Sequence, residues 1–168
     1  MNLTVHFTLE AFTRSATAER LGIDNTPSKE VIQNLTTTAE GLEKVRGVLQ
    51  LHNEAIGIDS GFRCEALEKV LTQKDFASWC ARHDKHPWDW VEYFSRKPHP
   101  KGYAGDFVCP AVGTPLEIVK KLAESDLQFD QLIQEGSWVH ISFDPRMRRE
   151  VLTAQFSPTG VNYTRGLS

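Results

Sequence analysis

Residues 129–143 read FDQLIQEGSWVHISF and decide the fold class. Apolar and polar residues alternate in the two halves of this stretch, 129–133 and 138–143, which is typical of strands that bury one face. Gly136 and Ser137 lie between the halves and favour a tight turn. The stretch therefore predicts an antiparallel β-hairpin late in the chain.

Helical patterns precede this hairpin. Thr8 is a candidate N-cap for a short helix over 9–14, and Thr26 followed by Pro27 predicts the start of a long helix. The sequence TPLE at 114–117 is a capping box that predicts another helix, ending near residue 125, and a helical pattern also covers 64–72. One apolar stripe with helical spacing runs along the long helix, formed by Val31, Leu35, Leu42, Val45 and Leu49.

Strand patterns are short and mostly late. Residues 55–59 and 103–108 are predicted strands, 151–156 is a predicted edge strand, and 157–168 is a predicted loose tail. Because helices come first and strands cluster late, the sequence favours an α+β fold with a small, mainly antiparallel sheet packed with helices. The length of 168 residues predicts a single domain over 1–168.

Composition limits the classes of function. Hydrophobic residues make up 40% and charged residues 24%, which is typical of a globular chain, and the net charge of −3 argues against nucleic-acid binding. No apolar run approaches the roughly 20 residues that span a bilayer, and the N-terminal residues do not resemble a signal peptide. We therefore expect no membrane span and a chain that is cytoplasmic on synthesis. Three widely spaced cysteines predict free thiols and a reducing compartment.

Residues 74–98 form a tryptophan-rich stretch. Trp79, Trp88 and Trp90 lie there among mixed charges, and Pro87 and Pro98 divide it, so we expect short helices. The tryptophans could form a platform on which sugars stack or a small core of their own. The core is the favoured interpretation, because a tryptophan buries a large apolar area.

Three residues are candidates for a metal site. His99 and Asp106 lie in HPKGYAGD (99–106), where prolines and glycines exclude a helix, so both side chains can turn toward one point. His140 is at the centre of the predicted strand 138–143. Imidazole and carboxylate are ligands that zinc accepts, and a catalytic zinc needs three protein ligands. A satisfied core histidine is the alternative, and the spacing alone leaves both open.

These strings resemble the zinc D-Ala-D-Ala carboxypeptidase family, which has the hedgehog/DD-peptidase fold and includes vancomycin-resistance dipeptidases and phage endolysins. Four motifs occur in the family's order: HFTLEAFTRSATA with GIDNTP near the N-terminus, SGFR at 60–63, the His99-to-Asp106 string, and WVH at 138–140. The resemblance covers about residues 3–155. It implies a zinc peptidase that hydrolyses peptidoglycan stem peptides, as a D,D-carboxypeptidase or an endopeptidase.

The resemblance also implies roles for individual residues. His99, Asp106 and His140 would bind one zinc ion per chain, and Glu135 would be the catalytic base. Arg63 would bind a carboxylate or carbonyl oxygen of the substrate, and the motif residues Ser60 and Trp138 would also contact it. The implied protein is monomeric and endolysin-like, and it acts on the cell wall after release through a membrane lesion made by a partner.

Two departures from the family pattern bear on substrate preference. Lys97 lies where the family usually has a serine, and the link between SGFR and His99 is longer than usual, with residues 74–98 as an insertion. The competing hypothesis is a non-catalytic, zinc-containing binding module or a phage structural component of the same fold. Retention of both Glu135 and Arg63 favours the enzyme, because a binding module does not need a base.

Overall fold

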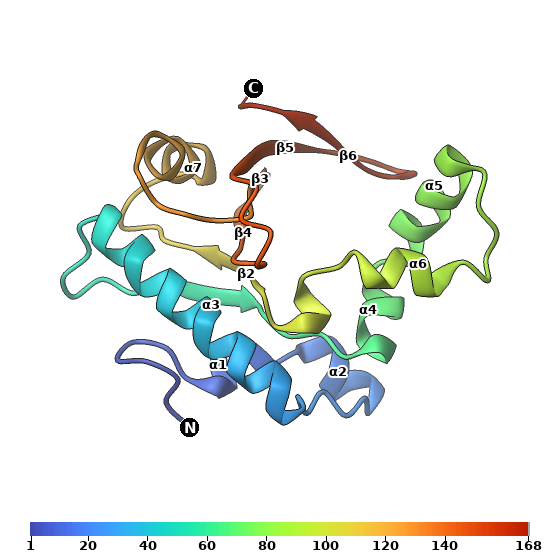
Figure 1. The fold of residues 1–168 in the computed structure, drawn as a ribbon, viewed down its shortest axis with the longest axis horizontal. Coiled ribbons are helices and arrows are strands. Elements are labelled where there is room, and N and C mark those ends of the chain that lie inside the picture. The colour runs from blue at the N-terminus through green and yellow to red at the C-terminus, as the bar shows by residue number, and fades with distance from the viewer. Residues whose placement is uncertain (168) are drawn as a thin grey trace.

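The structure, a computed structural model, describes residues 1–167 and confirms an α+β fold (Figure 1). The helices are α1 (Leu9–Thr13), α2 (Ala16–Leu21), α3 (Lys29–Val48), α4 (Glu65–Leu71), α5 (Gln73–His83), α6 (Trp90–Ser95), the 3₁₀ helix η1 (His99–Lys101) and α7 (Pro115–Glu124). The strands are β1 (Gly57–Ser60), β2 (Ala104–Val108), β3 (Gln131–Glu135), β4 (Trp138–Ser142), β5 (Glu150–Ser157) and β6 (Gly160–Arg165).

The predicted hairpin is the centre of a six-stranded sheet with the order β1-β2-β4-β3-β5-β6. Glu135 pairs with Trp138 and Ile133 with His140, and Gly136 takes a positive φ of 67° in the turn between β3 and β4. Such a φ favours glycine, because a Cβ atom would crowd the backbone there. The sequence pattern thus predicted the hairpin and its turn, although β3 begins and ends two residues later than the predicted strand 129–133.

The sheet is mixed rather than mainly antiparallel, which corrects the sequence-based expectation. β5 pairs with β3 in parallel, whereas β4 lies antiparallel on the other side of β3. The cause is a second reversal of the chain over 143–149, where Met147 and Arg149 have positive φ. Arg148 fixes this turn, because its Nε and Nη2 donate to the buried carboxylate of Asp130 at 2.8 and 2.7 Å.

The expectation of a loose tail is also wrong for the described residues. Residues 160–165 form β6, which pairs antiparallel with β5, so β5 is an internal strand rather than the predicted edge strand. Gly160 has a φ of 141° next to the turn and allows the chain to reverse after only two residues. Residue 168, the last of the predicted tail, lies outside the described residues.

Helix starts follow the predicted capping residues in two cases out of three. Thr8 caps α1, and Thr114 with Glu117 forms the complete capping box of α7. The long helix α3 begins two residues later than predicted, because the hydroxyl of Ser28 accepts from the Val31 N–H and Ser28 is therefore the N-cap. The sequence patterns did not predict α2, which Ser15 caps in the same way.

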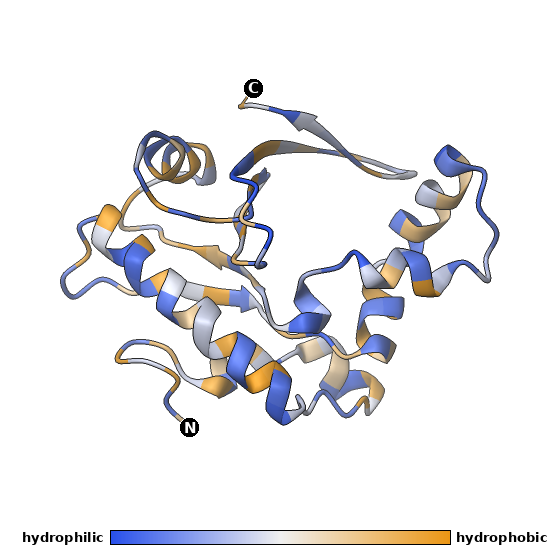
Figure 2. Cartoon of the chain, in the orientation of Figure 1, coloured by the Kyte–Doolittle hydropathy of each residue, from blue (hydrophilic) through white to orange (hydrophobic). Residues whose placement is uncertain are grey.

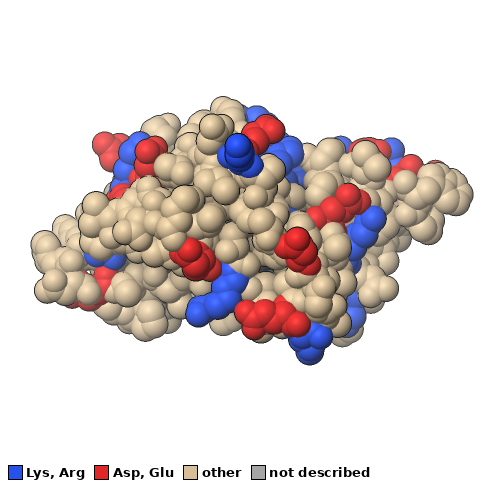
Figure 3. Space-filling view, turned by 90° about the horizontal axis from the view of Figure 1, so that it is seen from below, with Lys and Arg blue, Asp and Glu red and all other residues tan. Residues whose placement is uncertain are grey.

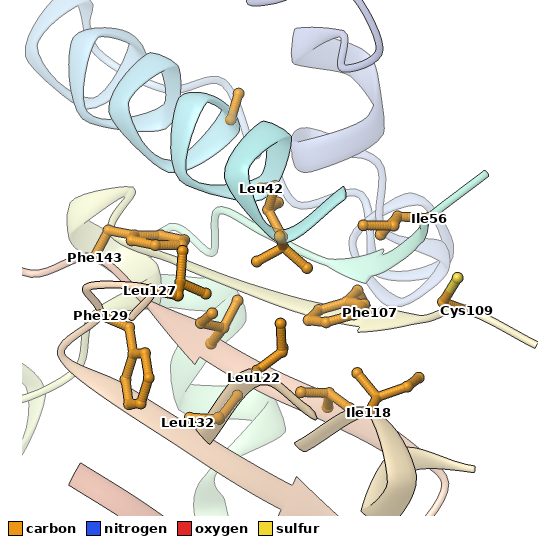
Figure 4. Packing of buried hydrophobic residues seen from close by; sticks show 14 of the residues in the cluster. Leu42, Ile56, Phe107, Cys109, Ile118, Leu122, Leu127, Phe129, Leu132 and Phe143 are labelled. Carbon is orange, nitrogen blue, oxygen red and sulfur yellow. The ribbon is translucent and has the colours of Figure 1, made fainter. Parts of the chain in front are cut away.

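One face of the sheet carries the main core. Phe107 and Leu132 are fully buried there and pack in one cluster with Leu42 of α3 and Leu122 of α7 (Figure 4). Ile141 of β4 is fully buried in the same cluster. Figure 2 shows hydrophobic and hydrophilic residues alternating along α3, as expected for an amphipathic helix with one covered side. Because side chains alternate along a strand, the neighbours of these residues point to the opposite face of the sheet.

The tryptophan-rich stretch forms a separate unit of short helices, as predicted. α5 and α6 lie with α4 at one side of the molecule, apart from α3 and α7, and the hairpin of β5 and β6 reaches toward α5 (Figure 1). Trp79, Trp90 and Tyr93 are buried in a cluster of their own, whereas Trp88 is 74% exposed. Figure 3 shows another face, on which acidic and basic side chains lie close together. Among the described helices, none is both long enough and apolar enough to span a membrane.

Candidate metal centre

The sheet register brings two of the three candidate ligands together. Asp106 on β2 pairs directly with His140 on β4, and Ser60 on β1 pairs with Asp106 from the other side. Directly opposed residues of antiparallel strands point to the same face, which here is the face opposite the main core. The register between β1 and β2 shifts between Ile58 and Ser60, a bulge that aligns the end of β1 with Asp106.

His99 reaches the same point from η1. Gly102 ends this turn with a φ of 78°, and a Cβ atom there would lie 2.8 Å from the Val31 carbonyl oxygen. Two polar residues of α3 hold the loop, because Asn34 donates to the carbonyl of Lys101 at 2.9 Å and Thr38 donates to that of Gly102 at 2.8 Å. The helix whose apolar stripe builds the core therefore also positions the loop that carries His99.

The three side chains form a compact buried group. One ligand atom from each of His99, Asp106 and His140 lies within 4.8 Å of the others, and all three residues are buried. Nε2 of His99 lies 3.2 Å from Oδ1 of Asp106, and Nδ1 of His140 lies 2.8 Å from the same oxygen. Among residues 1–167, this is the group of histidine, cysteine or carboxylate side chains that could hold a metal ion.

The hydrogen bond of His99 with Gly61 fixes which ring nitrogen faces this group. Nδ1 of His99 lies 2.6 Å from the carbonyl oxygen of Gly61, which can only accept, so Nδ1 carries a hydrogen. In the neutral ring, Nε2 then has a lone pair that faces a carboxylate oxygen of Asp106. Two lone pairs at 3.2 Å need a cation between them, either a proton or a metal ion. In metal-ligating histidines, the ring nitrogen that does not bind the metal typically donates its hydrogen to a backbone carbonyl or a carboxylate.

The charges in this buried group depend on one another. Burial favours the neutral form of Asp106, yet the charges of His99 and Arg63 and the hydrogen bond from His140 hold its pKa well below the usual range. Burial disfavours a charged His140, but its hydrogen bond with Asp106 and the Asp106 charge raise the pKa of His140. Asp106 is therefore ionised, and a metal ion would have to displace the proton that the raised pKa favours on His140. One carboxylate and two imidazoles form a donor set that fits zinc.

Arg63 and Ser60 were expected to bind substrate, and the structure places both beside Asp106. Arg63 Nη2 donates to Asp106 Oδ2 at 2.6 Å, and its Nε donates to Ser60 Oγ at 2.9 Å. The arginine is only 16% exposed, and its Nη1 lies 3.6 Å from Glu68. In this arrangement Arg63 orients the carboxylate of a candidate ligand, and Ser60 orients Arg63.

Two residues that support the centre were missed by the sequence-based interpretation. Gly61 packs so closely on α1 that a Cβ atom would lie 2.6 Å from the Phe12 carbonyl oxygen, which explains why glycine precedes Phe62 and Arg63. Asn25 ties this segment down, because its amide donates to the carbonyl of Phe62 and its oxygen accepts from Cys64 N–H at 2.8 Å. Asn25 belongs to the GIDNTP string, so the sequence analysis noted the motif but did not predict that Asn25 holds the segment after Gly61.

Glu135 and Trp138 face each other across the turn between β3 and β4. Trp138 Nε1 donates to Glu135 Oε2 at 2.6 Å, so the tryptophan that was expected to bind substrate holds the candidate base. Glu135 Oε1 lies 3.4 Å from the Tyr163 hydroxyl on β6, a long contact that leaves this oxygen the freer of the two. The charge of Glu135 contributes to the raised pKa of His140, which is consistent with a carboxylate close to the buried group.

The three candidate ligands line one cleft of about 940 Å³ together with Arg63, Glu135 and Trp138. Its floor is the sheet face opposite the main core, and its other side comes from α4, α5, α6 and the segment before η1. Glu135, His140 and Asp106 on the floor meet Arg63 and His99 from the loops. A cleft of this size accommodates a peptide segment or a comparable small ligand.

Comparison with known proteins adds no family assignment. Neither a scan of the chain against protein-family models nor a comparison with curated proteins gives a match. Function is therefore inferred from the geometry of the cleft and from the motifs in the sequence.

Proposed function

We propose that the chain is a zinc-dependent peptidase that hydrolyses peptide bonds in peptidoglycan stem peptides, as a D,D-carboxypeptidase or an endopeptidase. The observation that carries the proposal is the buried group of His99, Asp106 and His140 at the floor of a cleft that also contains Glu135. The resemblance of the motifs to the zinc D-Ala-D-Ala carboxypeptidase family supplies the substrate class. Under this proposal the chain is an endolysin-like monomer with the hedgehog/DD-peptidase fold that acts on the cell wall.

The donor set supports one zinc ion per chain. His99 Nε2, a carboxylate oxygen of Asp106 and a ring nitrogen of His140 would hold the ion. Three protein ligands are the number typical of a catalytic zinc. Zinc, when bound, supplies a Lewis acid that polarises a scissile carbonyl and lowers the pKa of a water molecule towards roughly 7. Arg63 keeps Asp106 in place through its 2.6 Å contact.

Glu135 is the proposed general base. Its buried carboxylate would accept a proton from the attacking water and then donate it to the leaving amine, a role for which general catalysis typically supplies 10²–10⁴-fold in rate. The hydrogen bond from Trp138 fixes Oε2 at 2.6 Å, so Oε1 is the oxygen available for the proton. Burial in the cleft keeps bulk water from competing for that proton.

The substitution Glu135→Gln tests the proposal. The amide retains the size of the side chain and still accepts from Trp138, but it cannot take up the proton. We expect the release of peptide fragments from purified peptidoglycan, measured by mass spectrometry, to fall by about 10²–10⁴-fold. Zinc content and Tm should remain close to those of the parent.

The matched control is Glu117→Gln, which changes a carboxylate in the capping box of α7, on the opposite side of the sheet from the cleft. This variant should retain the activity of the parent with a small loss of stability. If Glu135→Gln digests peptidoglycan at the parent rate, Glu135 is not the base. If the parent holds zinc but digests no peptidoglycan type, the binding-module hypothesis replaces the peptidase.

A further inference from the structure

Residues 154–163 form a two-stranded arm that extends beyond the rest of the sheet. The pairing of β5 with β3 ends at Thr153, whereas β5 and β6 continue to pair with each other, from Ala154 with Tyr163 to Ser157 with Gly160. An isolated pair of strands is only marginally stable in water. The arm therefore needs support from another part of the molecule.

The helix α5 supplies this support. Ser78 and Arg82 lie four residues apart, so they share one face of α5. Ser78 Oγ donates to the carbonyl of Thr159 at the tip of the arm. Arg82 Nη1 donates to the carbonyl of Val161 at 3.4 Å and to Oδ1 of Asn162. The tip of the arm is thus attached to the helical side of the cleft.

Gly160 shows how closely the arm and α5 pack. A Cβ atom on Gly160 would lie 2.7 Å from Ser78 Oγ and 3.2 Å from Ser78 Cβ. A larger residue would therefore push the arm away from α5 or move Ser78 out of its hydrogen bond. The contact is consistent with a sequence in which the turn of the arm carries glycine.

The other end of the arm lies beside the candidate general base. The Tyr163 hydroxyl lies 3.4 Å from Glu135 Oε1, and the Phe156 ring centre lies 5.9 Å from that of Trp138. Phe156, Val161 and Tyr163 all line the cleft. The arm therefore spans the distance from Glu135 on the floor of the cleft to α5 on its helical side.

The chain thus encloses the cleft (Figure 1). From α5 the backbone leads through α6 and η1 to His99 at the metal centre, and the sheet leads from there to β5 and the arm. The hydrogen bonds of Ser78 and Arg82 with the arm close this circuit. Because Arg82, His99 and Phe156 line the same cleft, the circuit surrounds the space in which a substrate would lie.

We propose that this enclosure admits free peptide ends, so that the chain acts as a carboxypeptidase rather than as an endopeptidase on cross-links. The assignment rests on the proposed function, because it takes the ligand to be a stem peptide. A linear stem enters the cleft by its carboxyl end while the arm stays on α5. A cross-linked peptide is attached to glycan on both sides of the scissile bond, so it reaches the metal centre only when the arm leaves α5. Steric exclusion of a competing substrate is a common source of specificity.

The proposed reaction removes one amino acid from the stem. The oxygen of a water molecule bonds to the last peptide carbonyl carbon, the C–N bond breaks, and the nitrogen takes up a proton. The stem keeps a new carboxylate, and the terminal amino acid leaves with a free amino group. Cleavage of a cross-link breaks the same kind of bond, so the shape of the cleft rather than the chemistry at the metal centre distinguishes the two substrates.

A disulfide across the contact tests whether substrate enters the closed cleft. The Cβ atoms of residues 78 and 160 would lie 3.2 Å apart, near the spacing of about 3.5–4.5 Å found in disulfides. Ser78→Cys and Gly160→Cys are combined with Cys80→Ser, which leaves α5 one thiol, and with Glu135→Gln, which separates binding from hydrolysis. Calorimetry with a linear stem pentapeptide should give the same affinity for the oxidised and the reduced zinc-loaded protein. The reduced form is the control for strain at position 160.

Removal of the contact tests the selectivity. Ser78→Ala combined with Arg82→Ala deletes the side chains that hold the arm. Mass spectrometry of digested peptidoglycan measures release of terminal amino acids and cleavage of cross-links in one sample. We expect the parent to release terminal amino acids and leave cross-links intact, and the double variant to gain cleavage of cross-links. Lys120→Ala, which removes an exposed cation from α7, is the control and should match the parent.

The outcomes separate the enclosure from the peptidase. Cleavage of cross-links by the parent overturns the enclosure, and so does a double variant that gains none. Binding of the pentapeptide to the reduced but not the oxidised cysteine variant, or to neither form, also overturns it. Equal binding to both forms without hydrolysis by the parent leaves the enclosure and overturns the peptidase.

Discussion

The substitution Gly61→Ala tests how the backbone supports the metal centre. The added Cβ atom would lie 2.6 Å from the Phe12 carbonyl oxygen and 2.8 Å from the Phe12 Cα atom. Both atoms are backbone, so α1 and the end of β1 must separate by about 0.4 Å to bring the shorter contact to 3.0 Å. Gly61 does not have a positive φ, so the cost arises from this clash rather than from the backbone conformation. Overpacking of this kind costs about 1–3 kcal/mol.

The displacement also moves the Gly61 carbonyl away from His99 Nδ1, which it contacts at 2.6 Å. Loss of such an outer contact typically lowers metal affinity by about 10–100-fold. We therefore expect Tm to fall by about 2–4 °C for each kcal/mol lost, and the zinc affinity to fall about tenfold. Differential scanning calorimetry and competition with a zinc chelator measure the two effects.

The matched control is Gly47→Ala. Gly47 lies near the end of α3, and a Cβ atom there would have nothing within 4 Å. This variant should be up to about 1 kcal/mol more stable, because alanine favours a helix over glycine. If Gly61→Ala matches the parent in both Tm and zinc affinity, then the close packing and the role of the Gly61 carbonyl are refuted.

Three further predictions concern the supporting contacts. Arg63→Lys replaces the guanidinium group, which contacts both Ser60 and Asp106, with a single ammonium charge, so the zinc affinity should fall about 10–100-fold. An unchanged zinc affinity would contradict the role of Arg63 in orienting Asp106. Burial opposes ionisation of Asp130, but its hydrogen bonds with Arg148 lower its pKa in the folded state. The ionised carboxylate therefore stabilises the fold at pH values above the unfolded-state pKa of about 3.9, and this stabilisation is lost as the pH falls through the lower folded-state pKa. Asp130→Asn should lose about 1–3 kcal/mol at neutral pH and show a flatter acid limb in thermal unfolding than the parent; an identical pH dependence would rule this out. Protein stripped of zinc with a chelator should have a Tm roughly 5–10 °C lower than protein measured with free zinc at about a hundred times Kd. An unaltered Tm would argue against zinc binding to the folded state.

Local sequence signals predicted the centre of the fold well. The alternation and the Gly136 turn in 129–143 predicted the hairpin of β3 and β4, although β3 lies two residues later than predicted. Turn type and hydrophobic pattern fix the register of such a hairpin. Thr114 and Glu117 gave the start of α7 for a similarly local reason. Once β2 pairs with β4, the meeting of Asp106 with His140 follows from that register.

The remaining features depend on contacts between distant residues. The parallel pairing of β5 with β3 needs Asp130 to bind Arg148 across 18 positions, and no short pattern encodes this. Arg63 was expected to bind substrate, and its additional contact with Asp106, 43 positions away, is one that no short pattern encodes.

The most direct test of the central claim is a calorimetric titration of zinc into chelator-treated protein. We predict about one equivalent of zinc bound per parent chain, and loss of this binding in His140→Ala, because His140 and Asp106 share the buried group with His99. Circular dichroism of the variant verifies that the fold persists. A parent chain that binds no zinc, or a folded His140→Ala variant that binds one equivalent with parental affinity, would contradict the account.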